Sequence, residues 1–181
     1  MKTYSLSNRN RLLSHLRTTF YALAVIGSLL TLASAEASDS PPEPITGEFF
    51  PCFTYAGPPR PVGENVIISF NVTTTVTGTL DGSLVGTELD IVHGDGSINL
   101  HGTAFFTGSI SGISGTFLLT YNGIGNAVTG HETLHFVGDH GTDGLTGVHI
   151  EGTAEGDLGA PEPGCDVSGA GTYTGDALFV P

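Results

Sequence analysis

The sequence has 181 residues, with 18 Asp or Glu against 5 Lys or Arg. All 18 acidic residues lie beyond residue 35, where Arg60 is the one remaining basic residue, so residues 36–181 carry a net charge of −17. A surface this negative repels phosphate backbones and anionic headgroups, which excludes nucleic acid and anionic membranes as partners.

Residues 1–35 have the pattern of a secretory signal peptide. An apolar run at 20–32 is followed by the small-residue cleavage site Ala33-Ser34-Ala35 and preceded by four basic residues, Lys2, Arg9, Arg11 and Arg17. A permanent anchor would need a longer apolar stretch. We therefore expect a cleaved signal, a secreted or periplasmic protein, and no membrane contact after cleavage.

Residues 36–65 hold seven of the ten prolines, which predicts an extended leader, with at most a short strand near 49–55. From Val66 the sequence pattern changes. Apolar and polar residues alternate almost continuously, and Gly and Asp residues typical of turns recur about every ten residues. This pattern predicts an all-β domain over 66–181, with strands at 66–77, 83–92, 97–107, 115–122, 128–137, 146–156 and 170–180.

About eight antiparallel strands in up-and-down order would leave exposed edges unless the sheet closes. We therefore expect a β-barrel, with a β-sandwich as the alternative. Period-two alternation predicts which side chains face the core. They are Val66, Ile68, Phe70, Val72, Val76, Ile98, Leu100, Ala104, Phe106, Phe117, Leu119, Tyr121, Val128, Leu134, Phe136, Val148, Ile150, Ala154, Tyr173, Ala177 and Phe179.

The two cysteines, Cys52 and Cys165, lie near opposite ends of the exported part. An even pair without C-x-x-C spacing in an oxidising compartment is most simply a disulfide. Neither cysteine has a His or a second Cys at ligand spacing, so we predict no metal site and no catalytic thiol here.

The segment 138–153, GDHGTDGLTGVHIEGT, resembles the glycine-rich hairpin of small bacterial proteins with an allene oxide cyclase-like barrel, relatives in fold of dirigent proteins. The stretch 106–119, FTGSISGISGTFLL, is similar to the preceding hairpin of that family. The resemblance implies an eight-stranded antiparallel barrel with a central apolar cavity, used in characterised relatives for cofactor-free cyclisation or for steering reactive intermediates. It carries over no catalytic residue.

The string His131-Glu132-Thr133-Leu134-His135 matches H-E-x-x-H, which binds zinc when a helix places both histidines on one face. The flanking Val, Thr and Phe residues favour a strand instead. Two strand residues four apart lie about 13 Å from each other, too far to chelate one ion. A zinc hydrolase is therefore the weakest of the functions considered.

As strand residues, Glu132 points inward and His131 and His135 point outward. A carboxyl group inside an apolar barrel can act as a general acid or base, and Tyr121 and Tyr173 would add hydroxyls on the same lining. The alternative is that Glu132 lies near the barrel mouth in contact with water.

We therefore predict a module that binds a small hydrophobic ligand or serves a structural role. The second hypothesis is a cofactor-independent isomerase or cyclase that uses Glu132, Tyr121 and Tyr173. No cofactor is expected in either case.

Overall fold

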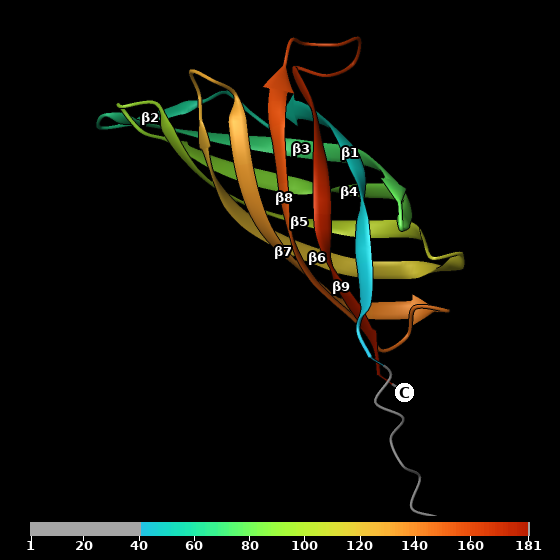
Figure 1. Ribbon diagram of the computed structural model, residues 1–181. Coiled ribbons are helices and arrows are strands. Elements are labelled where there is room, and N and C mark those ends of the chain that lie inside the picture. The colour runs from blue at the N-terminus through green and yellow to red at the C-terminus, as the bar shows by residue number, and fades with distance from the viewer. Residues whose placement is uncertain (1–40, 181) are drawn as a thin grey trace, which may run out of the picture. The chain divides into compact units, whose positions relative to one another are not determined.

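The computed structural model describes residues 41–180, which form nine β-strands (Figure 1). They are β1 (Glu43–Tyr55), β2 (Arg60–Val62), β3 (Asn65–Gly78), β4 (Leu80–Val92), β5 (Ser97–Ile110), β6 (Ile113–Asn126), β7 (His131–Asp143), β8 (Val148–Gly159) and β9 (Val167–Phe179). The predicted signal peptide lies outside the described residues. No helix in the part of the chain that the structure describes could span a lipid bilayer.

The strands form a closed antiparallel barrel, as predicted. From β3 to β9 each strand pairs with the next along the chain, and β1 closes the barrel by pairing with both β9 and β3. The short β2 is an extra strand that pairs only with the start of β3. Eight of the strands in residues 41–180 therefore make the barrel, and within this part of the chain only the β2 extension has an unpaired edge.

The proline-rich segment differs from the predicted leader at 36–65, because its residues 43–55 form the closing strand β1. Two of the prolines, Pro44 and Pro51, lie inside this strand. Pairing of β1 with β9 runs to Phe49 opposite Gly171 and resumes at Cys52 opposite Ser168, so Pro51 lies where that pairing is interrupted. Proline has no N–H to donate, and the interruption accommodates it.

The predicted inward faces match the buried face of the barrel, with one exception. Val128 is 84% exposed because it belongs to the turn between β6 and β7, and β7 begins only at His131. The tightest packing lies near the β5–β6 and β7–β8 hairpins. Six side chains there are less than 2% exposed: Ile45, Phe106, Ile110, Phe117, Leu145 and Ile150.

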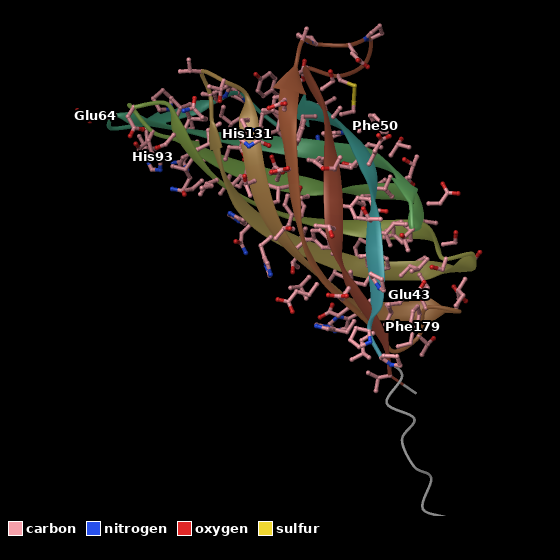
Figure 2. All side chains as sticks on the ribbon, in the orientation of Figure 1. Glu43, Phe50, Glu64, His93, His131 and Phe179 are labelled. Carbon is pink, nitrogen blue, oxygen red and sulfur yellow. A yellow bond between two sulfur atoms is a disulfide. The ribbon has the colours of Figure 1, made fainter. Side chains whose placement is uncertain are left out.

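The predicted disulfide is confirmed. Cys52 of β1 is bonded to Cys165 in the connection between β8 and β9, and their Cα atoms are 5.2 Å apart. Figure 2 shows the bond close to Phe50, while Glu43 and Phe179 mark the opposite end of the barrel. The disulfide therefore ties the closing strand to the loop at the end where β7 begins.

Candidate functional site

A cavity of about 90 Å³ lies inside the barrel, in the half that faces away from the tightly packed core. Its wall is mostly apolar and includes side chains from five strands: Phe49, Phe53, Val72, Leu84, Leu119 and Leu134. Polar residues interrupt this wall, among them Thr74, Glu88, Tyr121 and Glu132. The exposed Asp157 near the end of β8 also lines it, so the cavity comes to the surface at the end where β7 begins.

Three carboxyl groups are buried on the inner face of the barrel. Glu88 and Asp90 stand two residues apart on β4 and are 6% and 5% exposed, and Glu132 on β7 is 9% exposed. The inward position predicted for Glu132 is therefore what the structure shows. Glu88 and Glu132 line the cavity, and Asp90 shares the inner face with Glu88.

Glycines on the two intervening strands let these side chains approach one another. Gly102 of β5 stands between Glu88 and Tyr121, and a Cβ there would overlap the Tyr121 ring. The ring therefore crosses β5 and brings its hydroxyl within hydrogen-bonding reach of Glu88.

Glu132 leans in the same direction. A Cβ on Gly125 of β6 would lie 2.9 Å from its Cγ and 3.3 Å from its Oε1. The missing side chains of Gly102 and Gly125 thus leave space on the inner wall for the Tyr121 ring and for the Glu132 side chain.

Burial shifts the acidity of all three carboxyl groups. It raises the pKa of Glu88 to about 9, with a further contribution from the negative charge of Asp90. It raises the pKa of Glu132 to about 7, again with a contribution from Asp90. It raises the pKa of Asp90 to about 6, where a hydrogen bond from Glu88 opposes the shift. At pH 7 Glu88 is therefore protonated, Asp90 is largely ionised and Glu132 is partly ionised.

Asp90 has an unusual environment for an ionised group. Its Oδ1 is buried and has no hydrogen-bond partner among the described residues. Arg60 is the only Lys or Arg in residues 41–180, and it is an exposed residue of β2. A buried carboxylate without a cation is costly, and native structures retain such groups mainly at functional sites.

Tyr173 lines the same cavity, but its hydroxyl is already engaged. It accepts a hydrogen bond from the Leu80 backbone N–H at 2.9 Å and donates to the Thr77 carbonyl at 3.1 Å. Burial raises the pKa of Tyr173, which keeps the hydroxyl neutral. This residue joins β9 to the β3–β4 hairpin, whereas Tyr121 joins the carboxyl cluster. A catalytic role for either tyrosine stays a prediction.

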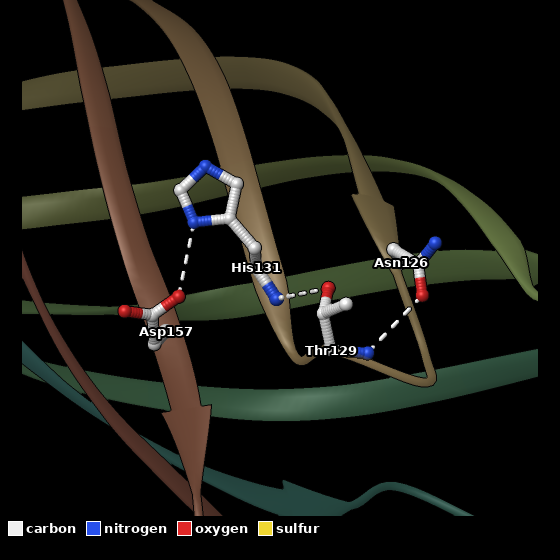
Figure 3. A network of polar contacts seen from close by, with 4 residues as sticks. All are labelled: Asn126, Thr129, His131 and Asp157. Carbon is white, nitrogen blue, oxygen red and sulfur yellow. Dashed lines mark hydrogen bonds and ion pairs between the residues drawn. The ribbon is translucent and has the colours of Figure 1, made fainter.

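The H-E-x-x-H string lies on strand β7, as the flanking residues predicted, so the helical geometry that zinc hydrolases need is lacking. Its histidines face outward toward acidic residues of β8. His131 Nδ1 lies 3.0 Å from Asp157 (Figure 3), and His135 Nε2 lies 3.1 Å from Glu151. Within residues 41–180, no three His, Cys, Asp or Glu side chains are arranged to hold a metal ion.

The β6–β7 turn beside the cavity mouth is held by its own side chains (Figure 3). Asn126 Oδ1 accepts hydrogen bonds from the backbone N–H groups of Val128 and Thr129, and Thr129 Oγ1 accepts one from that of His131. The His131–Asp157 pair then links this turn to β8. The hydrogen-bonded turn and the outward-facing His131–Asp157 pair therefore lie beside the mouth of the cavity.

The fold and the cavity define a small closed β-barrel protein with a partly apolar, acidic interior site. Residues 58–161 match the family described as "Protein of unknown function (DUF3224)", and the chain belongs to this family. No curated protein matches the chain.

A solved structure of a protein of unknown function from the same family, from Shewanella oneidensis MR-1, has a TM-score of 0.60. It is 21% identical over 78% of this chain and 99% of that chain, a likeness that shows the fold alone. The barrel implied by the resemblance to allene oxide cyclase-like proteins is thus confirmed. Kinship with those enzymes stays a prediction.

Glu88 and Asp90 are the site residues that sequence reasoning did not identify. The signal was present, because Leu84, Gly86, Glu88 and Asp90 alternate with outward residues and so share the inner face of a strand. Acidic residues rarely occupy buried positions. For a strand considered alone, this rule outweighs the alternation and places Glu88 and Asp90 on the outside.

Proposed function

We propose that this protein is an exported barrel that binds a small apolar ligand in its interior cavity. The observation that supports the proposal is the apolar wall with a few convergent polar groups, the arrangement typical of small-molecule sites. A volume of about 90 Å³ can enclose only a small molecule, or part of a longer one that extends through the mouth, since an engineered apolar cavity that accepts benzene measures roughly 150 Å³.

Export is part of this proposal and rests on sequence and chemistry. The signal-like residues 1–35 and the excess of acidic residues agree with a secreted or periplasmic protein. The Cys52–Cys165 disulfide agrees with an oxidising compartment.

Filling the cavity tests the binding function. Ala154 is buried in the cavity wall, and Ala154→Leu adds three carbon atoms to the cavity while keeping the site apolar. We expect binding of short-chain alcohols to fall at least about tenfold, because the ligand and the new side chain compete for one space. NMR titration of backbone amides around the cavity measures the affinity.

The matched control is Ala160→Leu, which makes the same change at an exposed position between β8 and β9. Binding that survives Ala154→Leu, or that fails equally in both variants, contradicts an interior site.

A second function is supported by the acidity of Glu132. Its pKa of about 7, raised by burial and by Asp90, suits a general base that works near neutral pH. A cofactor-free isomerase or cyclase would use this carboxylate to take a proton from carbon, with the Tyr121 hydroxyl nearby on the lining. The resemblance to allene oxide cyclase-like barrels agrees with this chemistry.

Deuterium exchange distinguishes the two functions. If Glu132 acts as a base, the α-hydrogens of a small ketone such as 2-butanone exchange with deuterium oxide faster in the presence of the protein. Glu132→Gln should reduce that exchange by about 100-fold or more. A pure binding module shows no catalysed exchange in either form, and Glu132→Gln leaves its binding of neutral ligands unchanged.

A further inference from the structure

The inner wall of the barrel carries buried carboxyl groups but no buried basic side chain among the described residues. Glu88, Asp90 and Glu132 are all buried, and the one basic side chain that lowers the pKa of Asp90 is His101, an exposed residue of β5. The facing groups from β6 and β7 are Tyr121 and Glu132, neither of which brings positive charge. The described chain therefore supplies no buried cation to this cluster.

Asp90 provides a second, independent observation. It is 95% buried, it points to the inner face of the barrel, and its Oδ1 has no hydrogen-bond donor among residues 41–180. A buried acceptor without a donor costs about 1–3 kcal/mol, and more when it is charged. Asp90 does not itself line the cavity, but a positively charged group beside Glu88 and Glu132 would be attracted by its carboxylate.

We propose that the ligand is a small apolar amine, whose protonated nitrogen is received by Glu88 and Glu132 at the cavity wall and neutralised by the charge of Asp90 behind them. This inference rests on the proposed binding function and names its ligand class. An alkylammonium ion has up to three donors and a narrow apolar tail. The tail fits a wall of aromatic and aliphatic side chains, and the nitrogen fits the carboxyl groups.

The geometry of the wall favours a monoamine over a metal ion. The described carboxyl groups are not arranged around one coordination point, whereas an ammonium group can form separate hydrogen bonds with groups that lie on different strands. The acidic Asp157 at the rim and the acidic surface as a whole would draw a cation toward the mouth.

The experiment compares three probes of one length, n-hexylamine, n-hexanol and hexanoate, bound to the exported form in 0.15 M salt at pH 8. Salt screens the general attraction of amines to an acidic surface. We expect hexylamine to bind about tenfold or more tightly than hexanol, since a hydrogen bond to a charged group is stronger than one to a neutral group. Hexanoate should not bind. Amide shifts around Leu84, Ala104 and Glu132 locate the site.

Two variants distinguish a loss of the preference for amine over alcohol from a loss of binding in the cavity as a whole. Asp90→Asn should reduce the preference for hexylamine over hexanol to about threefold or less while hexanol still binds. Glu155→Gln, which removes one exposed acid from β8, is the matched control and should leave the preference unchanged. Affinity for hexylamine should also rise from pH 6 to pH 8, because the bound cation favours the ionised carboxyl groups.

The outcomes are distinguishable. Equal binding of hexylamine and hexanol overturns the amine inference and leaves the proposed apolar binding function standing. Absence of binding by all three probes contradicts both. An amine preference that Asp90→Asn leaves intact, in a variant whose melting curve shows that it is folded, places recognition outside this cluster and overturns the inference.

Discussion

Glu88→Gln is expected to remove most of the loss of stability that the protein suffers as the pH rises. In the folded protein Glu88 keeps its proton to about pH 9, whereas in the unfolded chain it loses the proton near its ordinary pKa of 4.5. Between these values the unfolded state binds fewer protons than the folded state. The free energy of unfolding therefore falls as the pH rises through this window, by up to about 1.4 kcal/mol per pH unit.

Glutamine has nearly the same shape and carries no ionisable proton, so the variant should show little change in stability between pH 7 and pH 9. At pH 9 it should be more stable than the parent protein by a few kcal/mol. Urea denaturation at pH 5, 7 and 9 measures the effect. The raised pKa values of Asp90 and Glu132, about 6 and about 7, leave a smaller decline below pH 7 in both proteins.

Repulsion within the acidic surface also depends on pH, and an exposed variant controls for it. Glu155→Gln removes one carboxyl group from the outside of β8 and should follow the pH profile of the parent. If Glu88→Gln and Glu155→Gln behave alike, or if the parent gains stability from pH 5 to pH 9, then Glu88 is not held protonated in the fold.

Loss of the disulfide should produce the largest change in overall stability. Cys52 and Cys165 are separated by 113 residues, and closing a loop of this length contributes about 4–5 kcal/mol in the chain-entropy description. Whole domains are stable by only about 5–15 kcal/mol, so the double variant Cys52→Ser, Cys165→Ser should melt more than about 10 °C lower. Thermal and urea denaturation measure the difference.

Adding a reductant shows whether the loss of stability comes from the missing disulfide or from the two new serine side chains. Reduction of the parent should reproduce the loss of stability, whereas the double variant should not respond to reductant. Because Pro51 and Phe53 flank Cys52 and line the cavity, ligand binding should weaken in parallel. A parent protein whose melting temperature is the same with and without reductant would show that β1 holds its place without the covalent link.

Much of the barrel could be predicted because its strands carry a clear period-two signal. Inward residues were predicted for β3 and for β5 to β9, and only Val128 was placed wrongly, since a turn begins where the apolar pattern still continues. The closing strand β1 was largely missed. Its prolines argue locally against a strand, and only its neighbours β3 and β9 show that the pairing tolerates them.

The candidate site also has features that the sequence predicts and features that it does not. The inward direction of Glu132 followed from its parity with Leu134 and Phe136. Its partnership with Glu88 and Asp90 did not, because these residues lie more than 40 positions away on a strand three places around the barrel. The part played by Gly102 and Gly125 was also hidden, since a glycine in a strand shows nothing of the side chain that passes over it.

The sequence by itself determined the all-β class, the up-and-down order, the disulfide and the strand character of His131–His135, because each depends on residue type and spacing along the chain. Only the tertiary structure decided that β1 closes the barrel, that three acids share one inner wall, and that Asp90 Oδ1 has no hydrogen-bond partner among residues 41–180. Those features depend on which strands become neighbours and on how deeply the side chains are buried. Pairing and burial are properties of the whole closed sheet, and no single segment encodes them.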